Sequence, residues 1–487
     1  MNGEPKVYHV GTLSYTKGAL AVLFAWLLWG DFCFILMETI VPSIMPLKLQ
    51  ALGAPNTILG LFVTTIPRII DTLFNPIISF KSDRHRGRFG RRIPFIFFTL
   101  PFLVVCLVGL GFSEKIAAFL HHRLLNGLSA TTVTITVIGV TMTLFSFFNT
   151  FVNSVFWYLF NDVVPEQFLS RFMSWFRMVS MGAASLYSLF IFKHAATHST
   201  EIIVGAGALY FFGFGLMCLK VKEGAYPPPP TSGDGAGSAI AAVKTYGREC
   251  LGLSHYWYLF LANMGIVVAY SASIFSVFFY KSVGLALEDV GRLAFADRLA
   301  MAVAMPVAGW LADRYHPIRI VIAGLALQVL VSPIMLIWLF WQPSTQMVFY
   351  VLLGSHICLF SPIMAMFTVI DPPLAMRIFP RDRYGQFCSA NGMLRSLAAI
   401  VAGVLVGVFL DAITAHWDAK TAYCSLPLWN MMAYALALFA IIKLYRSWQR
   451  YGGDSAYYAP LPSIKVDASS VAAKFSTQPT TTIHEAS

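Results

Sequence analysis

Charged residues are scarce in this 487-residue sequence. Asp, Glu, Lys and Arg together make up 12% of it and hydrophobic residues 57%, whereas a soluble globular domain usually carries about 25% charged residues. This composition excludes an ordinary water-soluble fold. It predicts a protein embedded in a lipid bilayer.

Cysteine pairs, metal-ligand clusters and catalytic groupings are also missing from the sequence. The seven cysteines are scattered without a C-x-x-C pair, and a free cysteine in an apolar run behaves as a small hydrophobic residue. His121 and His122 stand beside Arg123 with no further ligand placed to help. No Ser/His/Asp cluster indicates an enzyme such as a membrane-embedded transferase. We therefore expect no metal, no cofactor and no catalysis.

The net charge of +11 does not indicate a nucleic-acid partner. The basic residues fall in short loops between apolar runs, where attraction to anionic lipid headgroups explains them. They concentrate after the second, tenth and twelfth runs, and they are fewer in the loops that must lie on the other side of the membrane. By the positive-inside rule both termini face the cytoplasm. With no cleavable signal pattern at the N-terminus, we expect a multi-pass protein of the cytoplasmic membrane.

Twelve apolar runs are long enough to cross a bilayer, for which a helix needs about 20 residues. They lie near 19–46, 56–80, 94–112, 131–160, 173–193, 200–220, 256–280, 290–312, 317–341, 345–370, 387–410 and 427–446. A polar segment with four consecutive prolines divides them into six and six. We therefore predict an all-α membrane protein of two pseudo-symmetric six-helix bundles. The expected divisions are bundles at 1–220 and 256–446, a cytoplasmic linker at 221–255 and a disordered cytoplasmic tail at 447–487.

The two halves share a sequence pattern. Arg68, Pro76, Asp83 and Arg84 recur 230 positions later as Arg298, Pro306, Asp313 and Arg314. A second marker, Pro-x5-Arg/Gln-Phe-x-Ser, follows both the fourth and the tenth run. Such a repeat indicates a duplicated membrane protein whose halves move against each other, which is the architecture of a secondary transporter.

Polar side chains form stripes on three of the first six runs. The stripes are Asp31 and Glu38; Arg68, Asp71 and Asn75; and Asn149, Asn153, Trp157 and Asn161. Ionisable groups at membrane depth are costly and usually face a bundle interior or a wet cavity. Together the stripes predict a hydrophilic cavity lined by the first half. Taken singly, an Arg68–Asp71 ion pair and amides that hold helices together explain these residues equally well.

A basic loop with the pattern Ser79-x3-Asp83-Arg84-x5-Gly90-Arg91-Arg92 follows the second run, and Gly309-x3-Asp313-Arg314 repeats its core in the second half. An Asp at a helix end can pair with Arg or with the N-terminus of a neighbouring helix. Such contacts can hold one closed conformation and break in the other. We predict conformational gating by Asp83, Arg84, Arg91, Arg92, Asp313 and Arg314, although basic residues alone would also serve to orient the chain.

At these residues the chain resembles the major facilitator superfamily. Within it, the loop SDRHRGRFGRRIPFI is similar to that of the sucrose/proton symporters, and the stretch from Arg68 to Pro76 resembles the melibiose-permease pattern of the glycoside–pentoside–hexuronide:cation symporters. The resemblance implies solute binding by Asp31, Asn153, Trp157 and Arg171, and the polar stripe adds Asn149. It implies proton or cation coupling at Asp71 and Asn75, to which the stripes add Glu38 and Arg68.

Two positions depart from that family pattern, because Asn75 and Asn153 stand where the family has acids. An amide can coordinate a cation through its carbonyl but cannot take up a proton. We therefore expect a proton-coupled sugar or glycoside symporter, working as a monomer, with Asp71 as the proton carrier, helped by Glu38. An uncoupled or cation-coupled facilitator of another small solute or lipid-like amphiphile is the alternative. A transporter-like sensor would need an output domain, and neither linker nor tail is large enough to fold into one.

Overall fold

The computed structural model describes residues 7–225, 250–380 and 383–460. Strands β1 (Tyr8–Val10) and β2 (Leu13–Tyr15) form a small antiparallel hairpin before the first long helix. The proline-rich part of the predicted linker and the end of the predicted tail lie outside the described residues.

The first half of the chain is helical almost throughout. Its elements are α1 (Lys17–Ala51), α2 (Asn56–Gly60), η1 (Leu61–Thr65), α3 (Ile66–Arg84), α4 (Ile93–Gly111), α5 (Ser113–Arg123), α6 (Ala130–Val163), α7 (Glu166–Leu186), η2 (Tyr187–Ile191), η3 (Phe192–His194), α8 (Ser199–Leu209), η4 (Tyr210–Phe214) and α9 (Gly215–Lys220). Several spans are continuous helices with one π-helical or 3-10 stretch, such as η1 between α2 and α3. Such local changes of helical winding often mark functional positions.

The second half repeats this organisation. Its elements are α11 (Ser254–Tyr270), η5 (Ser271–Phe275), α12 (Ser276–Ser282), α13 (Leu287–Tyr315), α14 (Pro317–Val331), η6 (Ser332–Leu339), α15 (Thr345–Ser355), η7 (His356–Phe360), α16 (Ser361–Ile378), α17 (Tyr384–His416), α18 (Ala419–Cys424), α19 (Leu426–Arg450) and α20 (Gly453–Ala456). After α20 the chain packs back on this half, where the Tyr457 hydroxyl donates to the Ile378 carbonyl at 2.8 Å. This part of the predicted tail is therefore ordered.

Twelve helical segments of the described chain are long and apolar enough to cross a membrane. They are Lys17–Ala51, Asn56–Ser79, Ile93–Gly111, Ala130–Phe160, Trp175–His194, Ser199–Lys220, Ser254–Ser282, Leu287–Ala312, Pro317–Leu339, Thr345–Ile378, Tyr384–His416 and Ala419–Arg450. Each overlaps one predicted span, so the twelve-span prediction is confirmed. His121 and His122, which lie between two predicted spans, belong to the short helix α5.

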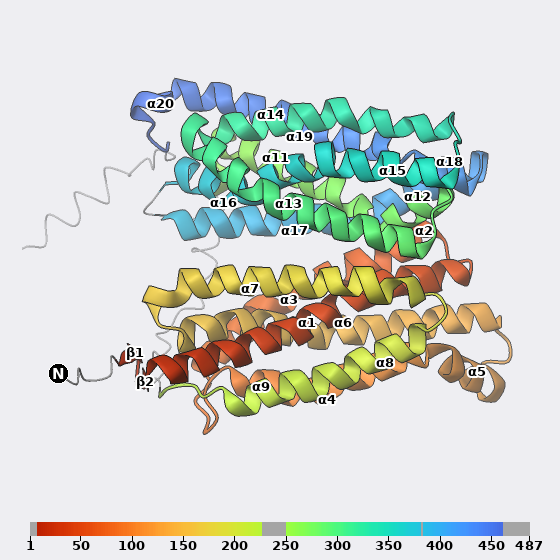
Figure 1. The fold of residues 1–487 in the computed structure, drawn as a ribbon, viewed down its shortest axis with the longest axis horizontal. Helices are drawn as coiled ribbons and strands as arrows, with labels where there is room; N and C mark the ends of the chain where they lie inside the picture. The colour runs from red at the N-terminus through yellow and green to blue at the C-terminus, as the bar shows by residue number, and fades with distance from the viewer. Residues whose placement is uncertain (1–6, 226–249, 381–382, 461–487) are drawn as a thin grey trace, which may run out of the picture.

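The two halves form two layers of helices (Figure 1), with the first half coloured red to yellow-green and the second green to blue. Two buried apolar clusters stabilise this arrangement of the helices. One cluster joins the first half to the parts of the second half farthest from the termini, including Phe275, Trp338 and Val406. The other, including Tyr256 and Phe387, belongs to the second half alone. The halves thus share a hydrophobic core at the end of the molecule opposite the termini.

Backbones from the two halves approach closely at this end. A Cβ atom on Gly60 would lie 1.8 Å from the carbonyl oxygen of Gly403, so only glycine permits this contact between the α2 and α17 segments. The Thr65 hydroxyl donates to the Ile400 carbonyl at 2.7 Å nearby. In Figure 1, α2 lies against α17 at the end away from the N-terminus. We call this contact region the closed end.

Candidate functional site

A cavity of about 500 Å³ lies between the two halves. Five of the predicted site residues line it, and all come from the first half: Glu38, Arg68, Asp71, Asn149 and Asn153. The second half contributes Tyr270, Ser271 and Ser273, among others. The cavity therefore gathers side chains from α1, α3 and α6, the three segments on which the sequence shows polar stripes.

Glu38 and Asn149 connect α1 to α6 inside this cavity. The Asn149 amide nitrogen donates to Glu38 Oε1 at 2.5 Å. The other polar atom of that amide, Asn149 Oδ1, is buried without a hydrogen-bond partner among the described residues. A buried acceptor without a donor is costly, so this oxygen is available to a donor group of a bound solute.

Two carboxylates and one guanidinium line the same cavity wall. Arg68 and Asp71 lie one helical turn apart on α3, and both interact electrostatically with Glu38 of α1. With both acids ionised, the three side chains carry one excess negative charge. Because an uncompensated charge at membrane depth is costly, the group can be balanced by one proton or one monovalent cation.

Asn75 does not line the cavity. It lies one turn beyond Asp71, where its Oδ1 accepts a hydrogen bond from the Ser79 hydroxyl at 3.3 Å. The same hydroxyl is 2.9 Å from the hydroxyl of Tyr158 on α6. Asn75 is thus part of a polar contact between α3 and α6.

Asp31 and Trp157 also lie away from the lining of this cavity. Asp31 is fully buried, and its Oδ2 accepts a hydrogen bond from Ser180 of α7 at 2.8 Å, while Oδ1 has no partner among the described residues. Trp157 packs edge-on against Phe176, with 5.0 Å between ring centroids, and the Arg177 guanidinium lies 6.0 Å from its ring. These two predicted residues therefore contact α7 instead of lining the cavity.

The backbone of Arg171 is on α7, but its side chain lies outside the described part of the structure. Sequence reasoning missed Arg177, one and two-thirds turns further along the same helix. A cation within an apolar span was the signal that could have found it, since intramembrane charges are functional candidates.

The basic loop folds around one carboxylate of α6. Arg91 Nε and Arg92 Nε donate to Asp162 Oδ2 at 2.8 and 3.0 Å, and Arg91 Nη2 pairs with Oδ1. Arg92 also donates to the Ser82 hydroxyl at 2.5 Å. These two predicted gating residues are therefore held within the first half. Asp162 was not predicted, although it lies at a helix end, where a carboxylate can pair with a basic loop.

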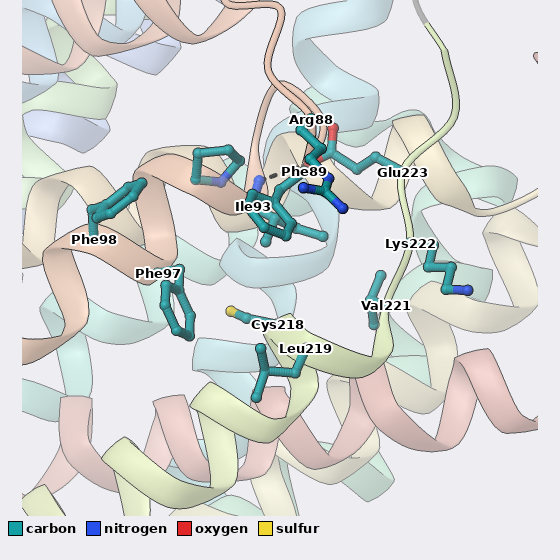
Figure 2. Close-up of a pocket in the computed structure, with 11 residues that line it drawn as sticks. Arg88, Phe89, Ile93, Phe97, Phe98, Cys218, Leu219, Val221, Lys222 and Glu223 are labelled. Atoms are coloured by element: carbon teal, nitrogen blue, oxygen red, sulfur yellow. Dashed lines mark hydrogen bonds between the residues drawn. The ribbon is translucent and has the colours of Figure 1, made fainter.

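A second carboxylate fixes the same loop from the segment after α9. Glu223 accepts hydrogen bonds from the backbone N–H groups of Arg91, Arg92 and Ile93 at 3.0, 2.9 and 2.7 Å. It thereby satisfies orphan donors at the start of α4. Figure 2 shows Glu223 reaching toward Ile93 at the edge of a pocket whose walls include Phe97, Leu219 and Val221.

The remaining predicted gating residues are described only in part. Arg84 lies at the end of α3, half-buried, and the side chains of Asp83 and Asp313 lie outside the described part of the structure. Arg314 stacks on two rings of its own helix, 5.3 Å from the Trp310 ring and 5.4 Å from that of Tyr315. Within the described ranges, no group of three or more His, Cys, Asp or Glu residues could hold a metal ion.

Comparisons with known proteins agree with this geometry. The sequence model of the Major Facilitator Superfamily matches residues 27–403. No curated protein matches the chain in sequence. Among solved structures, a bacterial homologue of the human lysosomal transporter Spinster aligns with a TM-score of 0.61 at 12% identity, covering 89% of this chain and 99% of that one.

Two further solved structures share the fold. The nucleoside transporter NupG, as its D323A mutant, aligns with a TM-score of 0.62 at 11% identity over 88% of this chain and 100% of its own. A D-xylose-proton symporter aligns with a TM-score of 0.58 at 14% identity over 86% and 96%. These proteins differ in substrate, so they do not select the glycoside symporter branch. By its family match and its twelve-helix, all-α fold, the chain belongs to the Major Facilitator Superfamily and is a multi-pass membrane transporter.

Proposed function

We propose that this protein is a proton-coupled symporter for a sugar or glycoside that works by alternating access. The observation that carries the proposal is the group formed by Glu38, Asp71 and Arg68, whose single excess negative charge faces a cavity between the halves. One bound proton would neutralise this group. The carrier could then change conformation without an uncompensated charge at membrane depth.

We assign the coupling proton to Asp71, with Arg68 as its neighbouring cation and Glu38 as the second acid. Asn75 and Asn153 cannot exchange a proton, since an amide has no titratable group in this range. Asp71 and Glu38 are the acids that line the described cavity wall. Uncoupled facilitation is the outcome to expect if neither of them titrates during transport.

We place the solute partly in the described cavity and partly between it and the end that carries the termini. Asn149 and Asn153 offer amide groups that suit sugar hydroxyls, and the cavity volume falls within the roughly 300–1,000 Å³ of small-molecule sites. Asp31 lies seven residues before Glu38 on α1, about 10 Å nearer the termini. The predicted contacts Asp31, Trp157 and Arg171 would then meet the other end of the solute.

The closed end supports the alternating-access part of the proposal. The halves share a hydrophobic core and direct hydrogen bonds there. We assign this closed end to the outer side of the cytoplasmic membrane, with both termini in the cytoplasm, from the distribution of basic residues. Arg91 and Arg92, held by Asp162, would act from the cytoplasmic side, together with Asp83, Arg84, Asp313 and Arg314.

Substrate-induced proton movement tests this function. Purified protein in proteoliposomes, given a panel of mono- and disaccharides without an imposed gradient, should alkalinise the outer medium when the correct sugar is added. Sugar-specific uptake without any pH change would show an uncoupled facilitator instead. No uptake of any member of the panel would contradict the substrate class.

A further inference from the structure

The second half contains a polar group at membrane depth that the proposed function does not use. Asp297 of α13 accepts a hydrogen bond from the Ser361 hydroxyl at 2.5 Å, and its Oδ1 lies 3.2 Å from His356 Nδ1. The other ring nitrogen of the histidine, Nε2, lies 2.9 Å from the Tyr280 hydroxyl. His356 of η7 therefore bridges the carboxylate of Asp297 on α13 and the phenol of Tyr280 on α12.

This arrangement gives each ring nitrogen of His356 a hydrogen-bond partner. A neutral His356 donates from Nδ1 to Asp297 and accepts from the Tyr280 hydroxyl at Nε2. When a proton is added at Nε2, both ring nitrogens become donors, so the Tyr280 oxygen must turn to accept. The Asp297 side chain is 39% exposed and that of His356 18%, so neither side chain is sealed inside the protein core.

Arg298 connects this group to the closed end. Its guanidinium donates to the Ala184 carbonyl at 3.1 Å and to the Ser188 hydroxyl at 2.5 Å, and both partners belong to the first half. The other titratable groups that face Asp297 and Arg298 are Tyr280 of α12, Tyr270 of α11 and Tyr187 of η2. Asp297 is thus the carboxylate that interacts with both His356 and this bridging cation.

We propose that His356 and Asp297 form a second proton-binding site and that its protonation stabilises the closed end. The proposal rests on the alternating access of the proposed function, but it needs no sugar. In the closed arrangement Arg298 has partners on the first half. When the halves separate there, Arg298 loses them and depends on the charge of Asp297.

The sign of the effect follows from competition for one carboxylate. A protonated His356 pairs with the negative charge of Asp297. When the halves are separated at the closed end, Arg298 then has no full counter-charge. Protonation of His356 therefore raises the free energy of the open arrangement relative to the closed one, and it shifts the population toward the closed arrangement. Lowering the pH should close this end, and raising it should favour opening.

The test measures closure directly, on the full chain in lipid nanodiscs without substrate. Spin labels at the exposed positions Lys193 and Glu288, on opposite halves at the closed end, report the distance between the halves. In the parent labelled protein, the ratio of closed to open molecules should rise by about tenfold between pH 8 and pH 5.5. His356→Gln and Asp297→Asn should each reduce that rise to less than about twofold.

Matched variants separate this site from a general effect of pH. His194→Gln removes an exposed imidazole from η3, at the same end, and should leave the response unchanged. Tyr280→Phe keeps the imidazole and should shift the midpoint of the response while preserving its size. A full pH response in both folded His356→Gln and Asp297→Asn would overturn the proposal. Absence of sugar-induced proton movement beside an intact pH response would contradict only the proposed sugar symport.

Discussion

Asp411 of α17 binds Thr57 at the start of the second span, across the boundary between the halves. Its Oδ2 accepts hydrogen bonds from the Thr57 backbone N–H at 2.8 Å and from the Thr57 hydroxyl at 2.6 Å. Its Oδ1 accepts two more from the backbone N–H and the amide of Asn56. A carboxylate at a helix N-terminus satisfies backbone donors that have no partner within the helix. These contacts must break if the halves separate at the closed end.

Asp411→Ala should therefore favour opening of the closed end. Loss of a charged acceptor with four hydrogen bonds should destabilise the closed state by about 2 kcal/mol or more, because those bonds exist only when the halves meet. The Lys193–Glu288 spin-label distance distribution should show a larger open fraction at constant pH. Asp418→Ala removes a carboxylate that caps α18 within the second half and should leave the distribution unchanged. Equal distributions in Asp411→Ala and the parent would contradict the role assigned to Asp411.

Gly403→Ala tests the close backbone contact at the same end. A Cβ at this position would lie 2.6 Å from Thr65 Oγ1, 2.9 Å from Thr64 Cβ and 3.1 Å from the Gly60 carbonyl oxygen. The clash should cost roughly 1–3 kcal/mol, and only in the closed state. Gly392→Ala, on the same helix with nothing within 4 Å of the new Cβ, is the matched control. Hydrogen exchange of the second span should rise in Gly403→Ala alone. Unchanged exchange there would show that this contact does not hold the closed end.

Asp162→Asn should destabilise the first half strongly. The Asp162 side chain is 8% exposed and pairs with the half-buried Arg91 and the buried Arg92, so neutralisation removes the charge with which it stabilises both cations. We expect a loss of about 3 kcal/mol in the free energy of unfolding. In detergent this would appear as a clear fall in Tm.

The exposed pair of Arg319 and Asp454 offers the control for that experiment, because the side chains are 43% and 56% exposed. Asp454→Asn should cost at most about 1 kcal/mol. If both variants lower Tm equally, burial of the Asp162 pair is not what stabilises the loop.

His316 should make stability depend on pH. It lies in the turn between α13 and α14, outside the spans, and burial lowers its pKa to about 4, helped by the nearby cation of Arg377. The unfolded chain has a histidine pKa of about 6.5. Between these values the unfolded state binds more protons, so the contribution to stability falls as pH drops from about 6.5 toward 4.

His316→Asn should remove this dependence. An Asn tolerates the positive φ of 69° at this position, and its side-chain oxygen can replace the histidine nitrogen that accepts from Ile318 N–H. Relative to the parent, the variant should gain Tm as pH falls from 7 to 4.5. His122→Asn, at an exposed position, should leave the pH profile as it is. A constant difference between His316→Asn and the parent across this range would contradict the prediction.

Sequence reasoning reached the twelve spans and five of the residues that line the cavity between the halves for identifiable reasons. Long apolar runs have few alternatives to spanning helices in lipid. Polar residues on one helix face, such as Arg68 and Asp71, must find a wet or polar environment, so periodicity was enough to place them together. The superfamily match and the predicted twelve-helix fold agree.

The remaining partners depend on tertiary packing that periodicity does not encode. Asp162 and Glu223 meet the basic loop from segments about 70 and 130 residues away in the chain. Asp411 meets Asn56 and Thr57 across more than 350 positions. Asp31 and Trp157 share a helix face with cavity residues, but they lie further along α1 and α6. There they contact Ser180 and Phe176 of α7, two partners that periodicity within α1 and α6 does not predict.

The central claim is that Asp71 carries the coupling proton in a cavity between the halves. It is tested most directly by comparing concentrative uptake with counterflow of one transported sugar in proteoliposomes, for the parent, Asp71→Asn and the surface control Asp454→Asn. Concentrative uptake requires proton coupling, whereas counterflow requires only binding and alternation of the halves. The account predicts that Asp71→Asn loses accumulation driven by a pH gradient and keeps counterflow, while Asp454→Asn keeps both. Accumulation at the parent level in Asp71→Asn would contradict it.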